Sequence, residues 1–249
     1  NGQTGLSPTA SLVDEFELLD GRTLDELPAD EKRAYQLDPQ PEKRDPRLGM
    51  SIIFPTETFL GYTAHPWEPS HKDAIGKEGS TKTGYWIKKW ANETDRTNYS
   101  STDGGKLDFQ NMRYAVVLLN YVEALNEYDP GNPDIEKYLN LIRERGGLGP
   151  VQSGLSQELM REQIRLERRI ELCFEQLRYF DTRRWLIADQ TDGGPFYGMN
   201  VDAGNSFTDE AFYEKTVFET RVFRPEFYLF PIPQSEINRD PQIVQNPGW

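Results

Sequence analysis

The chain has 249 residues, a length that suits one sizeable domain or two small ones. Its 41 acidic residues outnumber its 28 basic ones, and the resulting net charge of −13 disfavours nucleic acid and anionic membrane surfaces as partners. The single cysteine, Cys173, excludes an internal disulfide, and no run of about 18 apolar residues could span a bilayer.

The first 50 residues predict one short helix followed by a loop. Apolar residues recur across 12–19, and Thr9 or Ser11 can accept hydrogen bonds from the first free amides of the helix. The pair Asp20-Gly21 ends it. Residues 21–50 are polar and contain several prolines, so we expect a loop rather than a helix there.

Residues 51–109 mix short apolar runs with prolines and glycines, a pattern typical of a few short strands inside long loops. Aromatic residues are concentrated in this segment. Trp86 and Trp90 are four positions apart, so both would lie on the same face of a continuous strand.

Helical periodicity is clearest between residues 111 and 128. Apolar residues recur there at steps of three and four, and the sequence predicts that they form one buried stripe. The predicted stripe consists of Tyr114, Val117, Leu118, Tyr121, Leu125 and Tyr128.

Two further helices are predicted after this one. Asn132 caps the first of them, Pro133 occupies its first position, and Gly146-Gly147 ends it. The next begins near Ser156 and runs past Phe174. Helices joined by such short turns pack as antiparallel neighbours, as in tetratricopeptide-like arrays.

The remainder of the chain predicts little regular structure. Residues 189–226 are rich in glycine and aromatic residues and are expected to form loops, 228–233 should be extended, and 246–248 should form a turn. The predicted fold is therefore mostly α, with tetratricopeptide-like helix pairs, long loops and a few short β-strands.

Four stretches, in the same order, resemble segments of the SusD/RagB family. They are PTASLVDEFELLDG (8–21), RDPRL (44–48), the helical segments RYAVVLLNYVEALNEY, LNLIRERGGL and IRLERRIELCFEQLRYFDTRRW within 113–185, and FPIP to QNPGW within 230–249. Two positions depart from the family pattern: Val122 stands where alanine is commoner, and Gln176 where glycine is commoner.

The resemblance implies a function. Residues 1–249 would be the carboxy-terminal domain of a SusD-like protein, without its amino-terminal helical part and its lipoprotein signal. Such a lipoprotein faces outward on the cell outer membrane, binds oligosaccharides, and works with a SusC-like TonB-dependent transporter in nutrient uptake, as in starch utilisation. It is not an enzyme and needs no cofactor. The alternative is a tetratricopeptide-like scaffold that binds a peptide or protein, and a glycoside hydrolase ranks third.

The charged run at 165–185 can be interpreted as a basic recognition helix or as a structural surface. We favour the structural interpretation because acidic residues within the run offset its arginines. Two pairs at i,i+3 spacing are expected, Arg168 with Glu171 and Glu175 with Arg178.

The sequence favours neither a metal site nor a catalytic site. His65 and His71 are the only histidines, and they lie in a proline-containing loop that offers no zinc-binding template, so no metal is predicted. No G-x-S-x-G nucleophile motif occurs. Cys173 lies on an apolar helix stripe and is expected to be a core residue.

The aromatic residues of the segment 54–99 are the candidates for sugar binding, because a flat ring can cover the apolar face of a pyranose. Trp67 ranks first, since Pro66 and Pro69 stiffen the backbone around it. The alternative is that several of these rings fill the core beneath the loops. The candidate ligand-binding residues are Trp67, Tyr62, Tyr85, Tyr99 and Tyr35.

Overall fold

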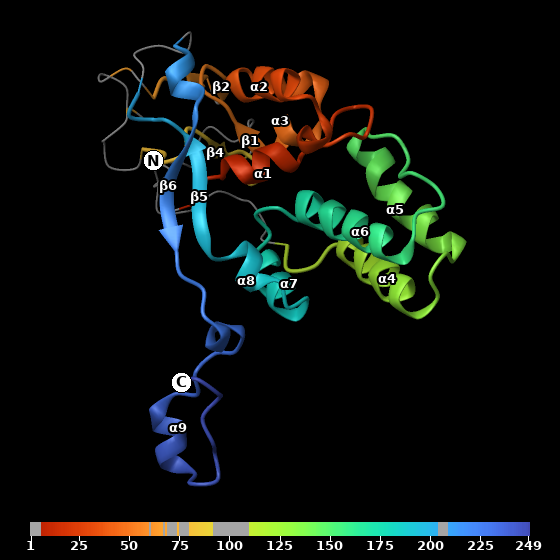
Figure 1. Ribbon diagram of the computed structural model, residues 1–249, viewed down its shortest axis with the longest axis vertical. Coiled ribbons are helices and arrows are strands. Elements are labelled where there is room, and N and C mark those ends of the chain that lie inside the picture. Colours follow the sequence, from red (N-terminus) through yellow and green to blue (C-terminus); the bar gives the residue numbers. More distant parts are fainter. Residues whose placement is uncertain are drawn as a thin grey trace.

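A computed structural model of the chain describes residues 6–59, 61–66, 68, 74, 80–91, 110–203 and 209–249. Helices dominate this part of the chain, and the strands in it are short and paired two by two, which confirms the predicted mostly α fold. Figure 1 shows the longest helices packed together on one side, shorter helices and strands on the other, and a carboxy-terminal arm that projects away from the body.

The helical unit consists of α4 (Tyr114–Tyr128), α5 (Pro133–Gly146) and α6 (Gln157–Glu171). The predicted caps of α5 and the predicted start of α6 are confirmed. The Asn132 side chain accepts a hydrogen bond from the Asp134 amide, the Ser156 side chain accepts one from the Leu159 amide, and Gly147 ends α5 at a φ of 86°. These short connections bring all three helices into contact.

Helix α6 is shorter than predicted. It ends at Glu171 instead of passing Phe174, because Phe174 and Gln176 both have a φ of 63° and the chain turns there. A left-handed backbone cannot continue a right-handed helix.

The predicted stripe on α4 is largely wrong. The buried side of the helix carries Ala115, Leu118, Leu119 and Val122, whereas most of the predicted stripe faces solvent. The exposed members are Tyr114, Val117, Tyr121 and Tyr128. Because α4 is apolar on nearly every side, two stripes satisfy the helical period, and the smaller residues are the ones that pack against α5 and α6.

The amino-terminal region contains α1 (Ala10–Glu15), α2 (Ala29–Leu37), α3 (Arg47–Ser51) and two 3₁₀ turns, Leu24–Glu26 and Pro41–Lys43. Thr9 caps α1 as predicted. The loop predicted for residues 21–50 is wrong in part, because α2 and α3 lie within it. Helix α2 buries no residue, so it has no apolar stripe by which the sequence could reveal it.

The first two sheets are two-stranded. Strand β1 (Ile52–Ile53) pairs antiparallel with β4 (Trp86–Ile87), and β2 (Thr58–Phe59) pairs antiparallel with β3 (Tyr62–Thr63). These strands confirm the prediction of short strands within long connections. Because β4 ends at Ile87, Trp90 lies beyond the strand, and the expected continuous strand through both tryptophans does not form.

The loop predicted for residues 189–226 is wrong in part, because the third sheet lies within this range. Strand β5 (Gly194–Met199) pairs with β6 (Lys215–Arg221), with an irregularity between Phe196 and Tyr197. Nearly every residue of β6 is exposed, so the strand lacks the alternation that identifies a half-buried strand. Gly198 allows β5 to approach the backbone of Thr83, since a Cβ atom there would come within 2.6 Å of the Thr83 Cα.

A second core fills the space between α1, α3, β1 and β5. Its most deeply buried members are Phe16, Leu48, Ile52 and Phe212, and Cys173 packs among them as predicted. Burial raises the pKa of the Cys173 thiol, which therefore stays protonated and unreactive.

The rest of the chain forms α7 (Arg178–Arg184), α8 (Ala188–Thr191), a 3₁₀ turn at Pro225–Tyr228, and α9 (Gln234–Arg239) in the projecting arm (Figure 1). The predicted turn at the end of the arm is present, with Gly248 at a φ of 88°. No helix in the described ranges is long and apolar enough to cross a bilayer.

Candidate ligand-binding site

The β2–β3 hairpin places part of the aromatic segment at the surface. Gly61, at a φ of 75°, forms the turn, and the hydroxyls of Thr58 and Thr63 lie 2.7 Å apart across the two strands. At the base of the hairpin, the Glu57 carboxylate accepts hydrogen bonds from the Phe54 amide at 3.1 Å and from Lys88 Nζ at 2.6 Å. These bonds fix the hairpin to the body of the protein.

A cavity of about 530 Å³ opens beside this hairpin. Its walls come from the end of α2, the start of the hairpin, the end of β5 and the 3₁₀ turn Glu210–Tyr213. The side chains that give it chemical character are Asp38, Thr56, Glu57, Met199 and Tyr213. Its volume lies within the range of small-molecule sites, about 300–1,000 Å³, and an apolar wall with a few polar groups is typical of them.

Tyr213 is the main aromatic group of this cavity. Its ring meets Phe212 edge to face, with 5.2 Å between the ring centroids, and Phe212 is fully buried. Burial, together with the negative charge of Asp38, raises the pKa of Tyr213 to about 12, so the phenol stays protonated and can donate a hydrogen bond. The carboxylates of Asp38 and Glu57 can accept hydrogen bonds from sugar hydroxyls.

The structure describes three of the five predicted ligand-binding residues, Tyr35, Tyr62 and Tyr85. Tyr62 lies on β3 and is 41% exposed. Tyr35 is half-buried and packs against a small cluster of leucines. Trp67 and Tyr99 lie outside the described residues.

Tyr85 is a core residue in this structure. It is 5% exposed, and its ring meets Phe54 edge to face, with 5.6 Å between the ring centroids. This agrees with the alternative that some aromatic residues of the segment fill the core. Tyr85 and Tyr35 both line a space of about 10 Å³ that they share with Tyr213, which is room for about one water molecule.

Tyr213, Asp38 and Glu57 were not predicted from the sequence. The first lies in the region assigned to loop, and the other two are ordinary acidic residues among 41. Their side chains come together only because α2 and the β5–β6 connection pack on the same face of the hairpin, so no local spacing could have identified them.

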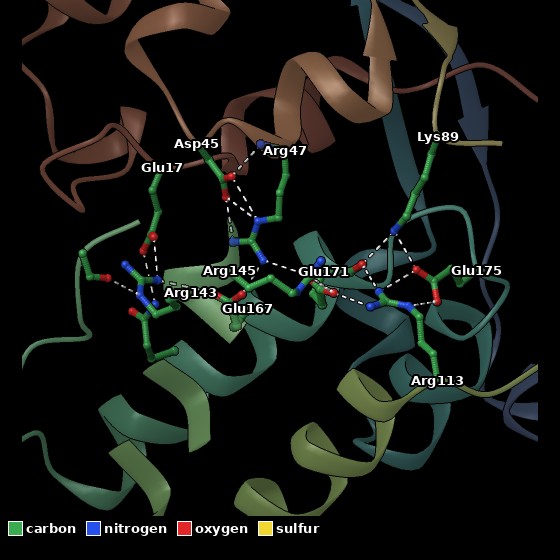
Figure 2. Close-up of polar contacts among 12 residues, drawn as sticks. Glu17, Asp45, Arg47, Lys89, Arg113, Arg143, Arg145, Glu167, Glu171 and Glu175 are labelled. Carbon is green, nitrogen blue, oxygen red and sulfur yellow. Dashed lines mark hydrogen bonds and ion pairs between the residues drawn. The ribbon is translucent and has the colours of Figure 1, made fainter. Parts of the chain in front are cut away.

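A second polar assembly joins the two halves of the body. Arg47 lies at its centre, donating to Asp45 (2.8 Å from Nη2 to Oδ2), to Glu167 (2.5 Å) and to Glu171 (2.9 Å), as Figure 2 shows. Gly146 makes room for this guanidinium, since a Cβ atom there would lie 2.8 Å from Arg47 Nε. We call this assembly the ionic network.

The ionic network extends from Arg47 in both directions (Figure 2). On one side, Arg143 Nη1 lies 2.7 Å from Glu17 and 3.3 Å from Glu167. On the other side, Glu171 also binds Arg113 and Arg145. Glu175 completes this side, 2.7 Å from Arg113 and 2.6 Å from Lys89.

The network balances its own charge. Five cations, Arg47, Lys89, Arg113, Arg143 and Arg145, meet five anions, Glu17, Asp45, Glu167, Glu171 and Glu175. All the anions are buried, and every member has an oppositely charged partner. Its role is therefore structural, since no net charge remains for a ligand.

The pairs predicted within the 165–185 run are wrong. Arg168 does not pair with Glu171; its Nε donates to Asp181 at 2.7 Å, and its Nη1 donates to Asn120 at 2.7 Å. Glu175 does not pair with Arg178. Arg168, Glu171 and Glu175 are buried between other segments, so their charges pair with residues of those segments. Pairs at i,i+3 spacing occur instead at Arg165 with Glu162 and at Arg184 with Asp181.

The described residues offer no evident place for a metal. No group of three or more His, Cys, Asp and Glu side chains that could hold an ion occurs within the described ranges. Of the two histidines considered above, His65 lies 3.9 Å from Glu68, and His71 is outside the described residues.

Comparison with known proteins places the chain in a family. The model of the SusD family matches residues 1–249. The chain belongs to the SusD family, as its motifs predicted. The SusD-like protein P2 of Formosa agariphila is 33% identical over 148 residues, which are 55% of this chain and 25% of that protein.

Solved structures support the same conclusion. A SusD-like protein of Bacteroides fragilis matches with a TM-score of 0.81 and 30% identity, over 100% of this chain and 48% of its own. A SusD-like carbohydrate-binding protein of the same species matches with a TM-score of 0.79 and 28% identity, over 96% of this chain and 50% of its own. The chain therefore spans about half the length of these solved relatives.

Proposed function

We propose that this chain is part of an outward-facing outer-membrane lipoprotein that binds oligosaccharides and passes them to a SusC-like TonB-dependent transporter. Membership of the SusD family along the whole chain carries the proposal. A solved relative of 28% identity is a carbohydrate-binding protein, which supports a saccharide ligand. The role is binding and delivery, without catalysis.

The proposed binding surface is the cavity beside the β2–β3 hairpin together with the exposed aromatic residues of the adjoining segment. Tyr213 provides a ring and a hydroxyl donor, and Asp38 and Glu57 provide acceptors. Tyr62 lies exposed on the hairpin, and Trp67 belongs to the same segment of chain. Rings that cover sugar faces and carboxylates that bind hydroxyls are the groups such a site requires.

Isothermal titration calorimetry of the full-length protein against neutral and acidic oligosaccharides tests this function. We expect saturable binding of at least one glycan. Trp67→Ala and Tyr62→Ala should each weaken it by about 1–3 kcal/mol, the cost of losing an aromatic anchor. Tyr128→Ala is a matched control, because this ring is 89% exposed on the distant helical unit and should not contact the glycan. Absence of binding to every glycan would contradict the proposal.

A protein ligand is the second candidate, and the outer face of α4 favours it. Tyr114, Val117 and Tyr121 form an exposed apolar strip on that helix. The Tyr121 ring meets Tyr138 of α5 edge to face, with 5.5 Å between the ring centroids. If this strip contacts the transporter, Tyr121→Ser should abolish co-purification with the transporter and leave glycan affinity unchanged.

A further inference from the structure

A second cavity, of about 600 Å³, lies where α6 and α7 meet the β5–β6 sheet. We call it the arginine cavity because Arg169, Arg178, Arg183 and Arg221 all line it. It is separate from the cavity beside the hairpin, with which it shares no lining residue. A chain with a net charge of −13 has here a local concentration of guanidinium groups.

Three of these arginines already have acidic partners. Arg169 binds Glu15, Arg183 Nη1 lies 2.8 Å from Asp192, and Arg221 Nε lies 2.9 Å from Glu219. These three ion pairs account for three of the four arginines, so one arginine has no carboxylate partner.

The unmatched cation is Arg178. Among the described residues its side chain makes neither a hydrogen bond nor an ion pair, and its guanidinium lies 5.9 Å from the centroid of the Trp185 ring. Burial, reinforced by the positive charge of Arg169, outweighs the attraction of the more distant carboxylates of Glu15, Asp192 and Asp181 and lowers its pKa to about 10. Arg178 therefore remains protonated at neutral pH, incompletely hydrated and without an ion pair. Such a group gains most from a bound oxyanion.

Aromatic rings form another part of the wall, which also carries Thr191, Thr220, Val222 and the paired carboxylates of Asp192 and Glu219. The guanidinium of Arg183 lies 3.5 Å from the centroid of the Tyr179 ring, and that of Arg221 lies 4.2 Å from the centroid of the Phe196 ring. Stacking of this kind fixes the planes of long side chains that would otherwise be mobile. The cavity thus combines flat apolar surfaces with donors suited to an anion.

We propose that the arginine cavity binds the oxyanion of an acidic saccharide, a uronate carboxylate or a sulfate ester, with Arg178 as its principal donor. A guanidinium offers two parallel N–H groups that match the two oxygens of such an anion. The face of the Phe196 ring that Arg221 does not cover would meet the apolar face of the sugar that carries it. This inference rests on the proposed function, because it names the class of glycan that the protein takes up.

The test compares charged and uncharged forms of the same glycan on the full-length protein. Trigalacturonic acid and its methyl ester test the carboxylate, and a sulfated carrageenan oligosaccharide and its desulfated form test the sulfate ester. We expect one charged form to bind between about ten- and a hundredfold more tightly than its uncharged form, as for a charge-assisted hydrogen bond. Added salt should reduce the difference.

Arg178→Gln should remove that preference, because the affinity for the charged form should fall to that for the uncharged form. Arg221→Gln, whose side chain is 49% exposed, gives a second variant should the first unfold. Arg239→Gln is the matched control, because it removes the same charge from a side chain that is 77% exposed in the arm. Melting temperatures check that each variant is folded.

The outcomes separate the two proposals. If only uncharged glycans bind, or if Arg178→Gln and Arg221→Gln both retain the preference for the charged form, the anion site is rejected and the proposed function stands. If no glycan binds in either form, the proposed function and the anion site both fail.

Discussion

The ionic network and the arginine cavity use the same residue types for different purposes. In the network, five cations face five anions, and the buried carboxylates of Glu167, Glu171 and Glu175 are each bound by more than one cation from segments far apart in sequence. In the cavity, four arginines face three carboxylates, and Arg178 has no close anion among the described residues. Charge compensation therefore distinguishes a structural junction from a candidate binding surface better than the number of arginines does.

We expect the largest loss of stability from a substitution in the ionic network. Arg47→Met removes the guanidinium that binds Asp45, Glu167 and Glu171, and leaves their buried carboxylates without a central partner. We expect the free energy of unfolding to fall by about 3–5 kcal/mol, measured by urea denaturation.

Arg145→Met is its control. Arg145 binds the same Glu171, but its side chain is 60% exposed, and Glu171 keeps two other cations. We expect a loss of less than about 1 kcal/mol. Equal effects of the two substitutions would show that Arg47 matters no more to the network than Arg145 does.

Two carboxyls of the network, Glu171 and Glu175, should make stability sensitive to acid, whereas burial raises the pKa of Glu167, whose protonation acts in the opposite direction. Burial raises the pKa of Glu171 and Glu175, but hydrogen bonds from Arg113 and nearby positive charges outweigh burial and hold both pKa values below the usual one. Carboxyls of lowered pKa stabilise the fold above their unfolded pKa, about 4.3, and that stability is lost as the pH falls through the folded value.

Urea denaturation between pH 7 and pH 3 measures this effect. Stability should decline below about pH 4.3, where the unfolded state takes up protons first. Arg113→Met should lower stability at pH 7 and make the decline shallower, because Arg113 is the main cause of both lowered pKa values. An unchanged slope in the variant would contradict this explanation.

Removing a charge from the arginine cavity should raise the free energy of unfolding, whereas removing Arg47 from the ionic network should lower it. Arg178→Met removes a partly buried cation that lacks a close anion, so the unliganded protein should become more stable by about 1 kcal/mol. Thermal denaturation without ligand measures it. Destabilisation of more than about 1 kcal/mol would mean that Arg178 is a structural residue, like Arg47.

The smallest expected effect on stability concerns Gln176, which lies in the sequence between Glu175 of the ionic network and Arg178 of the arginine cavity. Gln176 has a φ of 63°, a conformation that suits glycine, and glycine is the residue that the family resemblance led us to expect there. Gln176→Gly should stabilise the protein by about 0.5 kcal/mol, because relief of backbone strain slightly exceeds the added entropy of the unfolded chain. Differential scanning calorimetry would detect the shift, and a lower melting temperature would contradict it.

Local signals in the sequence predicted local structure well. Asn132 and Gly147 delimit α5 because capping depends only on residues within one turn of the helix end. Helix α2 escaped prediction because it buries no side chain. The buried face of α4 was wrongly chosen, since a helix that is apolar all round does not reveal which side meets its neighbours.

The candidate sites depend on contacts that the sequence cannot show. Arg47 and Glu171 are 124 residues apart, so spacing rules favoured pairs one helical turn apart instead. Tyr213 and Asp38 meet only after α2 and the β5–β6 connection have packed on the hairpin. The family resemblance predicted the fold and the class of protein, whereas the members of each cavity had to come from the structure.

The ionic network has a consequence for the order of folding. Its charges come from segments between residues 17 and 175, and a carboxylate such as Glu171 is compensated only when α3, α5 and the start of α4 have all arrived. Contacts this distant along the chain close late, after the local helices have formed. We therefore expect Arg47→Met to accelerate unfolding while hardly slowing refolding, the kinetic signature of interactions absent from the transition state.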